Sequence, residues 1–110
     1  MAITSIQKTR HEAVQFRGVF RDVEEYEAVY DPDSVGSNST VTDTIAAPGA
    51  EMGDMVLVSV DTDLQGLILI GNVSSADVVT LTLANTSAGA INIGSCNVHI
   101  ICMSPYHVLG

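Results

Sequence analysis

The chain has 110 residues, of which 46% are hydrophobic and only 15% are charged, and its formal net charge is −9. A chain of this length is expected to form one domain with a core of its own. The acidic balance argues against nucleic acid as a partner, because contact with phosphates needs a basic face. A membrane span is not expected either, since Asp, Asn or Gly interrupts each apolar run well before the required ~20 residues.

The charged fraction is well below the value of about 25% that is usual for soluble domains. Two explanations fit this composition. A β-rich domain could cover its surface with Ser, Thr and Asn. Alternatively, much of the surface faces protein, because obligate subunit interfaces are apolar and poor in charge. The two explanations are compatible, and we expect an oligomer.

The charges are unevenly distributed along the chain. All Lys and Arg residues lie within the first 21 positions: Lys8, Arg10, Arg17 and Arg21. Residues 22–110 contain twelve acidic residues and no Lys or Arg. This division could reflect chance and the need for solubility. Alternatively, the basic segment docks on an acidic partner or on a neighbouring acidic copy of the chain.

Residues 1–38 are predicted to form an N-terminal arm and linker, and residues 39–110 the β domain. Within the arm, residues 13–20 alternate loosely between apolar and polar and could form a strand. Residues 21–27 could be a helical turn or the end of that strand. Asp31-Pro32-Asp33, followed by a small polar stretch, is typical of a turn and linker.

From Thr40 onward, β signals recur at the short, regular spacing of a sandwich or barrel. Strands are predicted over residues 41–46, 55–60, 67–73, 78–84 and 98–103, with a short ladder piece over 91–93. Between the first two strands, Pro48 fixes φ for a turn, and Gly49 and Gly53 can adopt the positive φ of tight turns.

Two features of these strands constrain their packing. Residues 55–60 are apolar on both faces, so they need cover on both sides, from a second sheet or from another copy. Gly71 interrupts the strand at 67–73 and indicates a bulge or a close approach of the backbone.

No constellation of residues indicates catalysis or a cofactor. The common nucleophile, phosphate-binding, dinucleotide and C-x-x-C motifs are missing from the sequence, so an enzyme is not expected. His99 is expected to be packed or hydrogen-bonded rather than a metal ligand. Asp54, Asp61 and Asp63 lie near turns and could approach a calcium ion, but acidic turn residues usually cap backbone amides or face solvent.

The two cysteines are not expected to form a disulfide. Cys96 and Cys102 lie six residues apart in one predicted strand, which separates their Cα atoms by roughly 20 Å. A disulfide needs less than about 7 Å. Both are therefore predicted to be reduced, small apolar residues.

Residues 45–103 resemble a small β module found in many structural proteins of tailed bacteriophages. The resemblance lies in Ile45-Ala46-Ala47-Pro48-Gly49-Ala50 followed by Gly53-Asp54, in Val56-Leu57-Val58, in Gly66-Leu67, in VSSADVVTL (73–81) and in NTSAGAI (85–91). It implies a small antiparallel, jelly-roll-like sandwich that assembles as a trimer on virions.

The resemblance further implies a capsid decoration, or cement, protein that binds the major capsid protein on the outer capsid surface and bridges neighbouring capsid subunits. The arm would contact the capsid through Lys8, Arg10, Phe16, Arg17, Phe20 and Arg21. The trimer and core residues would be Val56, Val58, Leu67, Leu69, Leu81, Leu83, Ile100 and Cys102. An alternative is a trimeric tail-fibre or spike module that binds a host receptor through loops 61–65 and 85–89. A third interpretation, a soluble β-sandwich adaptor, leaves the uneven charge unexplained.

Overall fold

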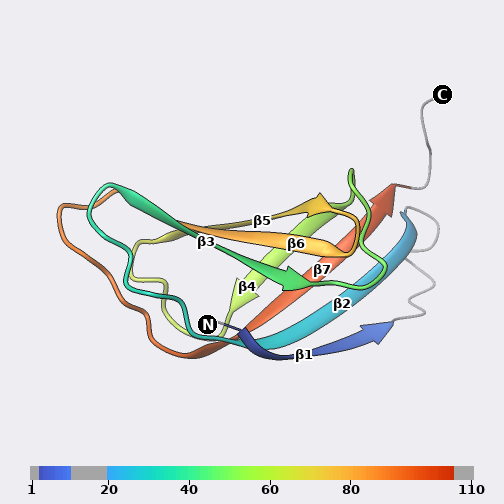
Figure 1. Ribbon diagram of the computed structural model, residues 1–110, viewed down its shortest axis with the longest axis horizontal. Coiled ribbons are helices and arrows are strands. Elements are labelled where there is room, and N and C mark those ends of the chain that lie inside the picture. The colour runs from blue at the N-terminus through green and yellow to red at the C-terminus, as the bar shows by residue number, and fades with distance from the viewer. Residues whose placement is uncertain (1–2, 11–19, 106–110) are drawn as a thin grey trace.

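The computed structural model describes residues 3–10 and 20–105, and side chains from residue 22 to residue 104. The regular secondary structure of the described residues consists of strands alone: β1 (Ile3–Arg10), β2 (Phe20–Tyr30), β3 (Ser39–Ala46), β4 (Met55–Val60), β5 (Ile68–Ser75), β6 (Val78–Asn85) and β7 (Cys96–Pro105). They form two antiparallel sheets, ordered β1-β2-β7-β4 and β3-β6-β5, which pack face to face (Figure 1). The predicted all-β sandwich is therefore confirmed.

The chain passes from one sheet to the other at four connections, over residues 31–38, 47–54, 61–67 and 86–95 (Figure 1). As a result β7 lies between β2 and β4 in one sheet, and β6 lies between β3 and β5 in the other. Strands that follow each other in sequence pair directly only in the β1–β2 and β5–β6 pairs. Each sheet is thus built mainly from strands that are not consecutive in the chain.

The core lies between the sheets and is built by strict alternation along the central strands. Val79, Leu81 and Leu83 of β6 are fully buried, and so are Val98 and Ile100 of β7. The remaining residues of these strands face outward. In β6 these outward residues are only partly buried. Alternating side chains therefore give each sheet one apolar inner face, as the sequence of β6 predicts.

The five strands predicted after Thr40 are confirmed, with ends that differ by at most two residues. The piece predicted at 91–93 is a single bridge, in which the amides and carbonyls of Val35 and Ile91 exchange hydrogen bonds of 2.8 and 3.0 Å. Gly49 and Gly53 both have φ of +97°, so the prediction of positive φ at these turns is confirmed. Each permits a tight turn between β3 and β4.

Residues 20–30, which the sequence places in the arm, form β2 in the interior of the larger sheet. The alternative of a helical turn over 21–27 is therefore wrong. The predicted strand at 13–20 falls outside the described residues except for Phe20, where β2 begins. Extended structure is favoured here because alternate residues of β2 reach the core, among them Tyr26 and Tyr30, which are fully buried.

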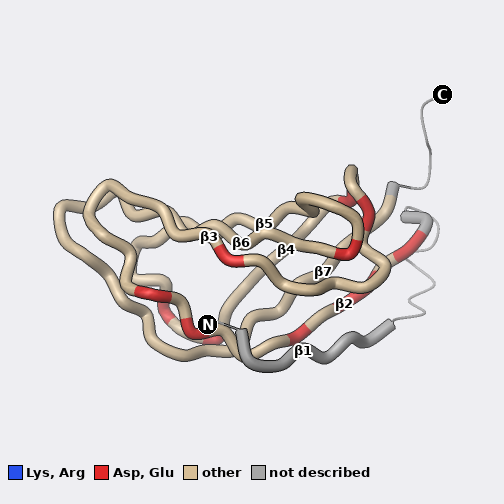
Figure 2. Tube along the Cα trace, viewed as in Figure 1, with Lys and Arg blue, Asp and Glu red and all other residues tan. Residues whose placement is uncertain are grey.

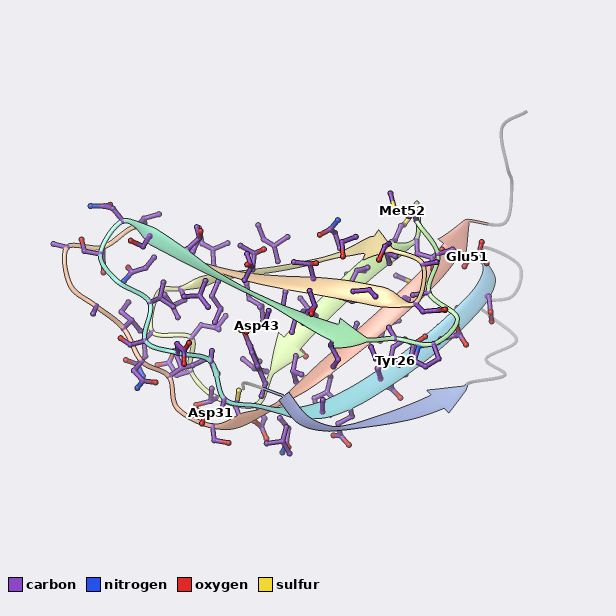
Figure 3. All side chains as sticks on the ribbon, viewed as in Figure 1. Tyr26, Asp31, Asp43, Glu51 and Met52 are labelled. Carbon is purple, nitrogen blue, oxygen red and sulfur yellow. The ribbon has the colours of Figure 1, made fainter. Side chains whose placement is uncertain are left out.

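These two tyrosines connect the sheets. The Tyr30 hydroxyl donates to Asp43 Oδ2 on β3 at 2.9 Å, and the Tyr26 hydroxyl donates to the carbonyl of Pro48 at 2.6 Å (Figure 3). Burial raises the pKa of both hydroxyls above the usual value, so both remain protonated donors. Each tyrosine thereby fills the core with its ring and satisfies its polar end at the facing layer.

Candidate interaction surfaces

The described surface carries acidic residues but no Lys or Arg between residues 22 and 104, as Figure 2 shows. The acidic positions lie on β2, on β3 and at the turns at both ends of the sandwich (Figure 2). On the outer face of the larger sheet, His99 Nε2 lies 3.2 Å from Glu27 Oε2, with both side chains about half exposed. His99 thus contacts a carboxylate on the neighbouring strand β2.

The residues predicted to contact the capsid belong to the first two strands and their connection. Lys8 and Arg10 are in β1, with Tyr26 and Glu24 of β2 as their register partners. Arg21 follows Phe20 at the start of β2. Because β1 and β2 are antiparallel, Arg10 and Arg21 belong to the same end of this strand pair. The other two, Phe16 and Arg17, lie outside the described residues.

The residues predicted for the trimer and the core all lie in the core of this single chain. Five are buried: Leu67, Leu81, Leu83, Ile100 and Cys102. Three are partly buried and pack against them: Val56, Val58 and Leu69. Any residues through which copies of the chain meet must therefore be sought on the outward faces of the same strands.

One such outward surface is strongly apolar. The exposed large hydrophobic residues of the described chain are Met52, Met55, Leu57, Ile68 and Ile70, with exposed fractions between 48 and 68%. They lie on β4, on β5 and in the turn before β4. The sequence predicted that residues 55–60 need cover on both faces. The second sheet covers one face, that of Val56, Val58 and Val60, and leaves the other exposed.

The acidic turn residues cap the chain locally. Asp54 accepts hydrogen bonds from the Glu51 amide at 3.0 Å and from the Ser104 hydroxyl at 2.9 Å, and Asp63 accepts one from the Gln65 amide at 2.9 Å. Among the residues that the structure describes, no three His, Cys, Asp or Glu side chains gather where they could hold a metal ion. Capping is thus the role that the structure assigns to these carboxylates.

Asp61 joins the end of β4 to the start of β7. Its two carboxylate oxygens accept from the backbone amide and the side-chain amide of Asn97, at 2.8 and 3.0 Å. These hydrogen bonds hold the pKa of Asp61 below its usual value. The contact holds loop 61–67 beside the start of β7. Loop 86–95 leads into β7, so both connections lie at the same end of the sandwich (Figure 1).

Asp61→Ala is expected to lower the melting temperature slightly at pH 7. The pKa of Asp61 is lower in the folded than in the unfolded protein, so the carboxylate stabilises the fold above its unfolded pKa of about 3.9. That contribution disappears as the pH falls through the folded-state pKa. Thermal unfolding followed by circular dichroism from pH 7 to pH 2 should therefore show the two proteins converging in acid. A constant difference over this range would contradict the assignment.

Loop 86–90 is shaped by a buried asparagine that sequence reasoning missed. Asn85 donates from Nδ2 to the carbonyls of Val35 and Gly89 at 2.9 and 2.8 Å. Its Oδ1 accepts from the amide and hydroxyl of Ser87 at 2.9 and 2.7 Å. A polar residue at the end of an apolar strand is the only signal in the sequence, and it equally suits a solvent-exposed turn.

Cys96 and Cys102 are both free and buried, as predicted. Burial raises the pKa of the Cys96 thiol, and it raises the pKa of the Cys102 thiol to about 11. Because the thiolate is the reactive form, both side chains are poor nucleophiles at neutral pH. They serve as small apolar residues in the core.

The structure defines an all-β sandwich with an acidic surface and an exposed apolar area on two strands. Comparisons of the chain with known protein families, with curated proteins and with solved structures find no match. Among the described residues there is no helix that could cross a lipid bilayer. The function is therefore argued from the surfaces themselves.

Proposed function

We propose that the chain is a capsid decoration protein of a tailed bacteriophage, which binds the outer capsid surface as a homotrimer and bridges neighbouring subunits of the major capsid protein. The observation that carries this proposal is the division of charge. Every Lys and Arg belongs to β1, to residues 11–19 or to the start of β2, whereas residues 22–104 carry only acidic charge besides histidine. In a shell-bound subunit, such a division would place attractive charge on the bound side and repulsive charge on the solvent side.

The strand order supports a jelly-roll-like reading of the sandwich. The strands β2, β7 and β4 of one sheet are sequence neighbours of β3, β6 and β5, which occupy the same order in the other sheet. The chain therefore rolls up as pairs of strands that bend from one layer to the next. Double-sheet jelly rolls of this kind are common in viral capsids.

Binding by this mechanism needs no single strong contact. Exposed ion pairs contribute about 0.2–1 kcal/mol each and are screened by salt. A trimer presents each contact three times, and a symmetric shell offers matching sites, so the overall affinity exceeds that of one contact. The acidic outer surface would keep decorated particles apart.

The test is shell binding by a variant that lacks the basic charges, K8Q/R10Q/R17Q/R21Q, measured by co-sedimentation with undecorated capsids. Loss of four weak ion pairs per copy should reduce the affinity at least about tenfold. The control, D31N/D33N/D63N, changes exposed acidic positions and should bind as the wild type does. Circular dichroism checks that both variants fold. Unchanged binding by the basic-charge variant would contradict the proposal.

The alternative, a trimeric tail-fibre or spike module, is favoured by one observation. Loops 61–65 and 85–89 lie at one end of the sandwich (Figure 1), where Asp61 accepts hydrogen bonds from Asn97 near the start of β7. Copy number separates the two functions. On a stained gel of purified virions, the band of a decoration protein should correspond to hundreds of copies per particle. The band of a tail module should correspond to only a few copies.

A further inference from the structure

The exposed hydrophobic side chains of the described residues gather on one flank of the sandwich. We call β4, β5 and Met52 the β4–β5 flank. Met55 and Leu57 point outward from β4, Ile68 and Ile70 point outward from β5, and Met52 projects away from the body of the protein (Figure 3). Single exposed hydrophobic residues are ordinary on protein surfaces, but a contiguous group indicates an interaction site.

The two strands of the flank are neighbours in space. Among the described strands, β4 and β5 are edge strands of their sheets. A Cβ atom at Gly71 of β5 would lie 3.1 Å from Val56 Cγ1 and 3.5 Å from Val58 Cγ1, so only glycine allows this approach without displacement. The predicted close backbone approach at Gly71 is thus confirmed. It places β4 and β5 side by side at one edge of the sandwich.

The flank also lacks the features that keep edge strands from associating. Edge strands are usually protected by Lys, Pro or other charged residues, or by a covering segment. Neither β4 (MVLVSV) nor β5 (ILIGNVSS) contains a charged residue or a proline. Depletion of charge together with exposed Met and aliphatic side chains is the composition found at the centre of subunit interfaces.

The charge of the remaining surface favours another copy of the chain as the occupant. With a formal net charge of −9, two copies repel each other wherever their acidic surfaces meet. The strands of the β4–β5 flank carry no carboxylate, so two identical copies meet less like charge there than elsewhere. In addition, β1 and β4 are at opposite edges of the larger sheet, so contact through β4 leaves the strand with Lys8 and Arg10 available.

We propose that the β4–β5 flank is the surface through which copies of this chain associate, with Leu57 and Ile70 at its centre. The inference rests on the proposed function in one respect, since it assigns the subunit interface of the trimer proposed there. It differs from the sequence prediction, which chose the inward residues of the same strands. Burying these outward side chains would supply the second cover that β4 requires.

The test is the mass of the L57E/I70E variant, measured by sedimentation velocity and light scattering across protein concentrations. Two carboxylates in an apolar interface should raise the dissociation constant at least about 100-fold, since desolvating unpaired charge is costly. The control, T42E/T44E, adds the same charge at exposed positions of β3, on the far edge of the smaller sheet, and should keep the wild-type mass.

A milder variant, L57T/I70T, keeps residues that favour strands and guards against loss of the fold, which circular dichroism monitors. Monomeric Glu or Thr variants beside an oligomeric wild type would support the proposal. Two results would overturn it. One is the wild-type mass in both variants. The other is a wild type that stays monomeric at about 100 µM, a concentration at which assembly interfaces are normally populated.

Shell binding separates this inference from the proposed function. A wild type that associates through the flank but ignores capsids contradicts only the decoration function. A wild type that binds capsids as a monomer contradicts the flank and the trimeric state, but not binding to the capsid itself.

Discussion

Replacing Gly49 with alanine is expected to destabilise the fold by about 2–4 kcal/mol, which combines backbone strain with a steric clash. Gly49 has φ of +97°, a conformation that L-residues rarely adopt. A Cβ atom would also overlap Glu24 Oε2 and lie 3.0 Å from Glu24 Oε1. Glu24 is only 6% exposed, and so cannot easily move away. Urea denaturation at fixed protein concentration measures the loss.

Gly53 offers a matched control four residues later. It has the same φ of +97°, but a Cβ atom there would meet nothing within 4 Å. Gly53→Ala should therefore show the backbone strain alone, about 1–2 kcal/mol. The difference between the two variants isolates the contact with Glu24. If the two substitutions cost the same free energy of unfolding, the packing of turn 47–50 against β2 would make no contribution to the effect of Gly49→Ala.

Leu81→Ala should cost about 2–5 kcal/mol, the range for a fully buried leucine whose cavity cannot collapse. Leu81 is 0% exposed and lies at the centre of β6, paired with Asp43 of β3 on one side and Gly71 of β5 on the other. Because β6 is the middle strand of its sheet, the neighbouring strands hold the cavity open. The free energy of unfolding from denaturant titration gives the loss.

Thr82→Ala provides the comparison on the outer face of the same strand. Thr82 is only partly buried, and a surface change of this kind usually alters stability by less than about 0.5 kcal/mol. Because side chains alternate along a strand, a slip of one residue would exchange the two faces. A larger effect at Thr82 than at Leu81 would therefore show that the register of β6 is wrong.

The sequence was sufficient for β3 to β7 because their signals are local. Alternation of Val79, Leu81 and Leu83 with threonines shows the inner face of β6 directly, and Gly49 and Gly53 mark the turn before β4. In β2 the inner face begins with Glu24, and that residue belongs to a run of acids that suggests a solvated surface. The alternation from Tyr26 to Tyr30 is a strand signal, but it follows the run of acids and precedes a turn and linker, and therefore does not separate β2 from the predicted arm.

The apolar flank could be predicted only in part. The sequence predicted that residues 55–60 need cover on both faces, because Met55 and Leu57 alternate with Val56 and Val58. It did not show that β4 and β5 occupy the edges of their sheets, or that they meet at Gly71. Those facts depend on pairing between strands distant in sequence, β4 with β7 and β5 with β6, and local patterns do not specify such pairing.

The central position of β6 and β7 affects how the protein is made. Until residues 78–105 emerge from the ribosome, β3, β4 and β5 have no strand to pair with, and β2 has only β1. The apolar segments of β3, β4 and β5 therefore have no strand partner through most of translation. Dependence on such distant contacts also predicts slow folding, in milliseconds to seconds rather than microseconds. Both sheets are therefore completed only after β6 and β7 have been synthesised, late in the production of each copy.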